Sequence, residues 1–188
     1  MRIVAGKWAG RHLTSPPDRR VRPTAEAVRD AWMKLVEPYL EGARLIDLFA
    51  GTGALGLEAM SRGARFADFV EDRPASLHAL KANIAALHVR ERTRVFKKDA
   101  LRFAAALEAA SYDLAFADPP YGSRMLDRLV EGWQARPFSP ILAVEHAAEH
   151  ELPAGGKRYL LEDTTAVTLY RASRRAASPP PAADSQRD

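Results

Sequence analysis

The chain has 188 residues, of which 47% are hydrophobic and 28% charged, an ordinary balance that predicts one substantial globular domain. It contains no cysteine, which excludes disulfides, thiolate metal sites and cysteine nucleophiles, and we expect a protein of the reducing cytoplasm. No stretch approaches the roughly 20 apolar residues of a membrane span, and the opening residues lack a signal peptide's apolar core, so we expect no membrane association.

The formal net charge of +4 is concentrated at the N-terminus. Residues 1–22 carry six basic side chains against one acidic, whereas the remaining residues carry 22 basic and 23 acidic. A short basic run is usually a solvated start of the chain, and charge alone favours that interpretation. The alternative is an arm that binds nucleic-acid phosphates through Lys7, Arg11, Arg19, Arg20 and Arg22.

The first predicted elements are two short β-like runs joined at Ala9-Gly10, which indicate a hairpin within residues 1–22. A proline-containing loop follows. Thr24 is a good N-cap for a helix predicted over residues 25–36, which Pro38 ends.

From residue 43 the sequence alternates between short apolar strands and helices. Strands are predicted over residues 43–50, 66–71, 93–99, 112–118 and 139–146, helices over 53–63, 74–87, 100–110 and 125–133, and a closing β pair over 157–162 and 166–172. This alternation implies an α/β fold, with right-handed crossovers and a mostly parallel sheet covered by helices on both faces.

These patterns divide the chain into three parts. We expect a basic arm over residues 1–22, an α/β domain over residues 23–172, and a disordered Pro/Ala-rich tail over residues 173–188.

Acidic residues recur at the ends of four predicted strands: Asp47, Glu71, Asp99 and Asp118. The carboxyl ends of parallel strands share one edge of a sheet, where ligands bind. A single acid there is usually a cap or a turn former, but four like charges at one edge need a compensating ligand.

The segment from Gly51 to Gly56 fits G-x-G-x-x-G, follows a strand and has Glu71 20 positions after Gly51. A dehydrogenase is one interpretation. Asp47 argues against it, because a carboxylate beside the glycine loop suits a pyrophosphate poorly. S-adenosylmethionine (SAM) carries an ammonium and a sulfonium and no phosphate, so acids at this edge favour it.

In this interpretation each strand end has its own role. Asp47 holds the methionyl ammonium, directly or through water, and Glu71 accepts both ribose hydroxyls. Asp99 accepts from the adenine amino group, with Ala100 supplying a backbone N–H. The predicted cofactor-binding set is Asp47, Phe49, Gly51, Thr52, Gly53, Glu71, Asp99, Ala100 and Asp118.

The fourth strand ends in Asp118-Pro119-Pro120-Tyr121, which we interpret as the catalytic segment. An exocyclic amine of a base is a poor nucleophile, and acceptors around its N–H groups favour the pyramidal geometry of the transition state. The Asp118 carboxylate and the Pro119 carbonyl are such acceptors, and the prolines restrict their motion. Tyr121 offers a face on which an extruded base stacks. This direct displacement requires no metal.

These motifs resemble those of class I SAM-dependent amino-methyltransferases, with DLFAGTGALGLEA, VED, KKDA and DPPY in order. RIVAGKWAGRHL, followed by Arg22-Pro23-Thr24 and a helix, makes the chain similar to the RsmD family, bacterial 16S ribosomal RNA guanine-N2 methyltransferases. The resemblance covers residues 1 to about 171. It implies a Rossmann-like, seven-stranded sheet whose last strands are antiparallel, and SAM as cofactor, with S-adenosylhomocysteine as product.

The resemblance also implies the partner, which is 16S rRNA within the small (30S) subunit or its assembly intermediate, and we expect a monomer. Since an acid-rimmed pocket repels a polyanion, the basic arm becomes the expected RNA contact. Trp8 either stacks on that RNA or packs the hairpin on the core.

Three other functions stay open. A DNA adenine-N6 methyltransferase uses the same DPPY segment, but generally needs a larger target-recognition region. An NAD-dependent dehydrogenase uses the glycine loop. A non-catalytic ribosome-assembly factor would keep the fold, although the intact Asp118-to-Tyr121 segment argues against it.

Overall fold

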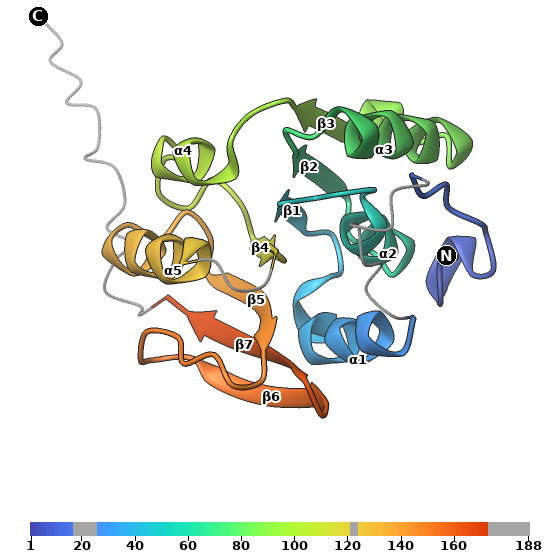
Figure 1. Cartoon of the computed structure of the whole chain (residues 1–188). Coiled ribbons are helices and arrows are strands. Elements are labelled where there is room, and N and C mark those ends of the chain that lie inside the picture. Colours follow the sequence, from blue (N-terminus) through green and yellow to red (C-terminus); the bar gives the residue numbers. More distant parts are fainter. Residues whose placement is uncertain (17–25, 121–123, 173–188) are drawn as a thin grey trace, which may run out of the picture.

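The computed structural model describes residues 1–16, 26–120 and 124–172, which form a seven-stranded sheet with helices on both faces (Figure 1). The strands are β1 (Arg44–Leu48), β2 (Phe66–Val70), β3 (Thr93–Phe96), β4 (Leu114–Ala117), β5 (Ile141–Ala147), β6 (Lys157–Glu162) and β7 (Thr165–Arg171). Three predictions lie outside the described residues: the tail over 173–188, the site residues Arg19, Arg20, Arg22 and Tyr121, and the division at residue 22.

The strand order is β3-β2-β1-β4-β5-β7-β6. The neighbours from β3 to β5 pair in parallel, whereas β7 runs antiparallel to both β5 and β6. From β1 the chain winds outward to β2 and β3, and then returns to the other side of β1 with β4. Ligands of such sheets bind at this switch, outside the carboxyl ends of the strands. The mostly parallel seven-stranded sheet predicted from the sequence is confirmed.

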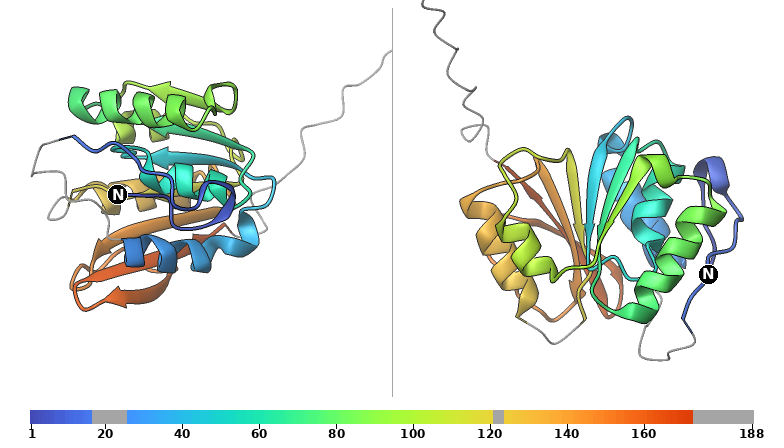
Figure 2. Two further views of the ribbon diagram at one scale, coloured as in Figure 1. Left: turned by 90° about the vertical axis from the view of Figure 1, so that its right-hand side faces the viewer. Right: turned by 90° about the horizontal axis from the view of Figure 1, so that it is seen from above.

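Two layers of helix cover the sheet, as the view from above in Figure 2 shows. The layer on one face holds α1, α2 and α3, and the layer on the other holds α4 and α5. The helices are α1 (Glu26–Val36), α2 (Ala54–Ser61), α3 (Pro74–Ala86), α4 (Ala100–Ala105) and α5 (Met125–Ala135), with short 3₁₀ turns at η1 (Gly6–Trp8), η2 (Glu37–Tyr39) and η3 (Arg90–Arg92). Among the helices described, none is both long and apolar enough to cross a membrane.

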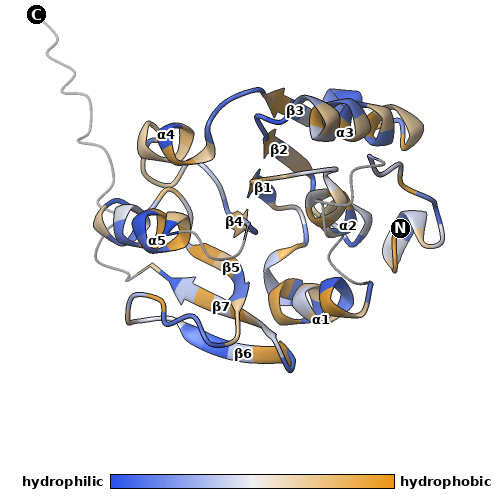
Figure 3. Ribbon diagram, viewed as in Figure 1, coloured by the Kyte–Doolittle hydropathy of each residue, from blue (hydrophilic) through white to orange (hydrophobic). Residues whose placement is uncertain are grey.

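The two faces of the sheet bury separate cores. In β4, Leu114 and Phe116 face the layer of α1 to α3, where Trp32 packs edge-on against Phe116 with ring centroids 5.7 Å apart. Ala115 and Ala117 face α4 and α5. This alternation follows from the period of two along a strand. The helices α1 and α5 show hydrophilic and hydrophobic bands, as expected for helices with one face on the sheet and one in solvent (Figure 3).

Residues 1–16 do not form the predicted two-stranded hairpin. They contain no extended strand and pair through one isolated antiparallel bridge, between Arg2 and His12, where Ile3 donates to the carbonyl of Arg11 and Leu13 to that of Met1, each at 2.9 Å. The backbone N–H groups of Val4 and Ala5 donate to the carboxylate of Glu58, at 2.7 and 2.9 Å, so the pairing does not continue past Ile3.

The same segment packs firmly on the domain. Ile3 and Leu13 are buried in the core beneath α1 to α3. Glu58 is fully buried and pairs with the equally buried Arg29, whose guanidinium also donates to the carbonyl of Arg2. Because an unpaired buried charge is costly, this arrangement fixes the first residues against α1 and α2.

Candidate active site

The carboxyl rim, which is the edge of the sheet formed by the carboxyl ends of β1 to β5, brings together the acids predicted from the sequence. Leu48 of β1 pairs with Val70 of β2 on one side and with Ala117 of β4 on the other. Glu71 and Asp118 directly follow these two partners, so both lie beside the end of β1. Both also act electrostatically on Asp47.

Asp47 is the buried acid of the rim. Its side chain is 2% exposed and accepts the backbone N–H of Gly56, in the first turn of α2, at 3.0 Å. Burial raises the pKa of Asp47 to about 8; the Gly56 hydrogen bond opposes this rise, and the charges of Asp118 and Glu71 add to it. Its carboxyl group is therefore mostly protonated at neutral pH, and a cationic ligand group would favour its ionised form.

The glycine loop turns tightly between β1 and α2. Gly53 has φ +79°, and a Cβ there would lie 2.3 Å from Cδ1 of Leu80, so any other residue would be strained and would displace that side chain. Phe49, just after β1, also has a positive φ of 64°, which is strained for a bulky residue. Strain of this kind often marks a functional site, and here it lies beside Asp47.

Glu71 is buried and already engaged by several donors. Its carboxylate accepts the backbone N–H of Gly51 at 2.7 Å and that of Arg73 at 2.8 Å. The guanidinium of Arg73 donates to it as well, with Nε 3.1 Å from Oε1. The backbone donors fix the carboxylate next to the glycine loop, whereas the half-exposed Arg73 side chain is a partner that a ligand hydroxyl can replace.

Asp99 and Ala100 lie where β3 passes into α4. Asp99 is exposed, and its Oδ1 caps the helix by accepting the N–H of Arg102 at 2.8 Å. Ala100 is buried at the first position of α4. Since β3 is the neighbour of β2, Asp99 follows Glu71 along the same rim.

Asp118 is half-buried, directly after β4, and Pro119 behind it is buried while Pro120 is exposed. The charge of Asp118 acts on Asp47, as expected for two acids at the same edge of the sheet.

Two residues of this region were missed in the sequence analysis. Arg73 lies only two positions after Glu71, and this spacing alone indicates that the two side chains can form an ion pair. Asn83 is buried in α3 and bonds the carbonyl oxygens of Thr52 and Thr14, each at 3.0 Å. It thereby ties the glycine loop to the N-terminal segment, and a lone polar residue on an apolar helix face was a weak sign of that role.

The predicted RNA-binding residues Lys7 and Arg11 are exposed but do not lie at the rim. The backbone N–H of the neighbouring Trp8 donates to the hydroxyl of Ser61 at the end of α2, and the guanidinium of Arg11 donates to the carbonyl of Ala86 at the end of α3. Both helices run away from the rim, so these cations lie toward the opposite, amino end of the sheet.

Comparisons with known proteins agree with this geometry. The family model described as "Conserved hypothetical protein 95" matches residues 1–163. Ribosomal RNA small subunit methyltransferase D of Escherichia coli (strain K12) is 34% identical over 185 residues, which cover 94% of this chain and 91% of the relative. The protein of the same name from Haemophilus influenzae is 30% identical over 177 residues, which cover 91% and 92%.

A solved structure shows the same fold. A hypothetical protein of Thermus thermophilus superimposes with a TM-score of 0.77 at 30% sequence identity, over 92% of this chain and 99% of that chain. The sheet therefore has the class I methyltransferase architecture, and the chain belongs to the RsmD family of SAM-dependent methyltransferases, the family of the matching model.

Proposed function

We propose that this protein transfers a methyl group from SAM to the exocyclic N2 amine of one guanine in 16S rRNA of the small ribosomal subunit. The observation that carries the proposal is the carboxyl rim itself, where a buried acid lies within electrostatic reach of the acid that opens the Asp118-Pro119-Pro120 segment. A cationic cofactor and an amine substrate both suit such a site, and a polyphosphate does not.

The residues of the rim fit SAM. Asp47 has a buried carboxyl group whose ionised form a nearby cation would stabilise, and the methionyl ammonium is such a cation. Glu71, held by the N–H of Gly51, would accept the ribose hydroxyls once the Arg73 side chain moves away. One carboxylate oxygen of Asp99 caps α4, and the other would accept a hydrogen bond from the adenine amino group. When bound, SAM supplies an electrophilic methyl group on its sulfonium.

The chain's own part in the reaction is to position and polarise the target amine. Asp118 and the carbonyl of Pro119 would accept its two N–H groups and hold the nitrogen lone pair toward the methyl group. The two prolines restrict the backbone that carries these acceptors, so little motion is needed as the transition state forms. The acceleration then comes mainly from orientation and preorganised acceptors.

The names of the relatives support ribosomal RNA as the substrate. The proteins of Escherichia coli and Haemophilus influenzae are named as ribosomal RNA small subunit methyltransferases, and each aligns with more than nine-tenths of this chain. A substrate of this kind also accounts for the basic N-terminal residues, which an acidic rim alone does not.

The direct test is methyl transfer to defined substrates. The protein would be incubated with tritiated SAM and either 30S subunits from cells that lack its gene or double-stranded DNA. We expect label in 16S rRNA only, recovered as N2-methylguanosine after digestion. Label in DNA adenine, or no label in either substrate, would contradict the proposal.

A further inference from the structure

A second basic segment surrounds the edge strand β3. Residues 88–98 carry five basic side chains, Arg90, Arg92, Arg94, Lys97 and Lys98, against the single acid Glu91. Acids elsewhere in the chain balance them, so the net charge of residues 23–188 conceals this local excess. Part of the segment is visible in Figure 3 as the hydrophilic connection from β3 to α4.

The start of this segment contacts the N-terminal segment. The guanidinium of Arg92, in η3, lies 5.8 Å from the ring centroid of Trp8, and Nζ of Lys7 lies 5.9 Å from the same ring. Arg11 reaches over to the carbonyl of Ala86 at 2.9 Å, where α3 ends. Five residues from two distant parts of the sequence thus form one surface, which we call the Trp8 surface: Lys7, Trp8, Arg11, Arg90 and Arg92.

The cations of the Trp8 surface are available to an outside partner. Lys7, Arg11, Arg90 and Arg92 are absent from every ion pair among the described residues, whereas Arg44 and Arg94 are both held by Asp68. Glu91, the single acid of residues 88–98, forms none of these ion pairs either.

A cavity of about 560 Å³ lies in the same place. It is lined by Ala85, His88, Val89, Arg90, Glu91 and Arg92. This volume is within the range of about 300–1,000 Å³ that small-molecule sites occupy, so it is large enough for one nucleotide. Cations, a partly exposed indole and a recess of this size are the features by which proteins bind single-stranded RNA.

We infer that the Trp8 surface is a docking site for a single-stranded stretch of RNA, whose phosphates bind the four cations around Trp8. This inference rests on the proposed function, because it assigns the surface to the same ribosomal substrate. It differs from the arm predicted from the sequence, since Arg90 and Arg92 come from the connection between α3 and β3.

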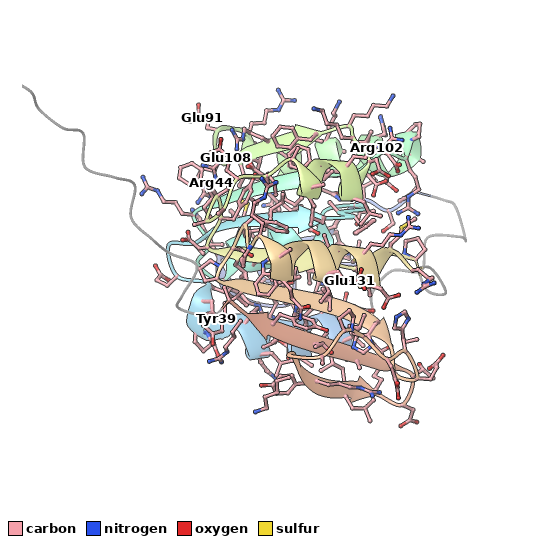
Figure 4. All side chains as sticks on the ribbon, turned by 90° about the vertical axis from the view of Figure 1, so that its left-hand side faces the viewer. Tyr39, Arg44, Glu91, Arg102, Glu108 and Glu131 are labelled. Carbon is pink, nitrogen blue, oxygen red and sulfur yellow. The ribbon has the colours of Figure 1, made fainter. Side chains whose placement is uncertain are left out.

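The surface lies far from the rim. Figure 4 shows Glu91, before β3, and Arg102, in the first turn of α4, at opposite ends of the sheet. The 13 residues of α3 separate its rim end from Ala86, and at about 1.5 Å per residue they span about 20 Å. A target base at Asp118 and an RNA strand at Trp8 therefore belong to a substrate much larger than a single nucleotide.

The test is direct binding of the full-length protein to purified 30S subunits across a salt series. A triple variant, Arg11→Gln, Arg90→Gln and Arg92→Gln, removes three surface cations and changes no buried side chain. We expect its affinity to be at least about tenfold weaker than that of the wild type near 0.1 M salt. The slope of log affinity against log salt should become shallower by about 2, as for three lost phosphate contacts on single-stranded RNA.

A matched control removes the same charge elsewhere. Arg136 donates to the carbonyl of Ala105 at the end of α4, as Arg11 does at the end of α3. Lys157 and Arg171 lie over the rings of Tyr159 and Tyr39, as Arg92 lies over Trp8. The triple Gln variant of these three should bind 30S subunits like the wild type. Glu91→Gln should bind them more tightly, by a few fold.

Equal losses in both triple variants, or no loss in either, would overturn the inference, and so would a wild type that does not bind subunits. Thermal unfolding of each variant separates lost binding from lost folding. The binding assay needs no methyl transfer. A wild type that binds subunits through this surface but never methylates them would therefore contradict the proposed function and support the docking site.

Discussion

The two ends of the sheet present opposite chemistries. At the carboxyl rim, Asp47, Glu71 and Asp118 gather around the end of β1, and the first two of them are buried. At the amino end, Lys7, Arg11 and Arg92 are grouped around Trp8 and form no ion pairs within the described chain. The rim suits a small cation, and the Trp8 surface suits a polyanion.

The ends also differ in how their charges are held. The rim acids are fixed by backbone N–H groups, as Glu71 is by Gly51 and Asp47 by Gly56, so their geometry is set before any ligand arrives. The cations at the other end are carried on long surface side chains, which adapt to a flexible strand and whose effect is screened by salt. We therefore expect the rim to hold its ligand in one defined geometry, and the Trp8 surface to bind its partner with an affinity that depends on salt.

The largest effect is expected for Asp118→Ala. Removing one preorganised acceptor of the target amine should lower the methyl-transfer rate by roughly 100-fold or more, while the affinity for SAM changes little. Single-turnover transfer to 30S subunits and calorimetry with SAM measure the two quantities. Near-wild-type turnover would remove Asp118 from the mechanism.

A smaller effect, on cofactor binding, is expected for Glu71→Ala. The ribose hydroxyls would lose a charged acceptor, and such hydrogen bonds contribute about 1.5–3 kcal/mol each. SAM affinity should fall at least about tenfold, as measured by calorimetry. Since Glu71 also holds the N–H of Gly51, Glu71→Gln is the informative companion: it keeps an acceptor there and should lose less. Unchanged affinity in both variants would place the ribose elsewhere.

Asp47 should release a proton when SAM binds. Its pKa of about 8 leaves it mostly protonated at pH 7, and pairing with the methionyl ammonium would lower that pKa. Calorimetry in buffers of different ionisation enthalpy should detect close to one proton released per SAM, and none for Asp47→Asn. Equal proton release by both proteins would show that Asp47 does not pair with the cofactor.

The stability of the free protein gives an independent check on the same group. A carboxyl group whose pKa is raised by folding contributes stability below its ordinary pKa, and this contribution is lost as the pH rises through about 8. The melting temperature of the wild type should therefore fall more steeply between about pH 5 and pH 8 than that of Asp47→Asn, and the two curves should run parallel above that range. Parallel curves between pH 5 and pH 8 would mean that Asp47 is already ionised in the folded protein at these pH values.

The smallest effect is expected for Arg73→Ala. Its guanidinium occupies the carboxylate of Glu71, with Nε 3.1 Å from Oε1, and must leave before ribose hydroxyls bind there. Its removal should tighten SAM binding by a few fold and leave the 30S affinity unchanged. Weaker SAM binding would instead indicate that Arg73 itself contacts the cofactor.

The sequence predicted the rim much better than the amino end, and the reason is physical. Parallel strands must end at one edge, so acids at the ends of β1, β2 and β4 meet there once the alternation of strands and helices is recognised. The contact of Arg92 with Trp8 depends instead on how two segments more than 80 residues apart pack together. No local pattern specifies such a contact.

The N-terminal hairpin illustrates the same limit. The β-like runs were read from local composition, but Glu58, more than 50 residues away, takes the N–H groups of Val4 and Ala5. Neighbouring residues in the sequence do not specify this acceptor, nor do they specify that Asn83 bonds Thr52 and Thr14. The α/β domain was predictable because its alternation of strands and helices repeats along the sequence. Each of these contacts occurs only once, so no repeating pattern predicts it.

The most direct test of the central claim is mass spectrometry of 16S rRNA nucleosides from cells that lack this gene, complemented with either the wild-type protein or Asp118→Ala. The wild type should restore one N2-methylguanosine in 16S rRNA, and Asp118→Ala, present at the same level, should not. An rRNA profile that is the same in all three strains, or full restoration by Asp118→Ala, would contradict the assignment of the carboxyl rim as the site of rRNA methylation.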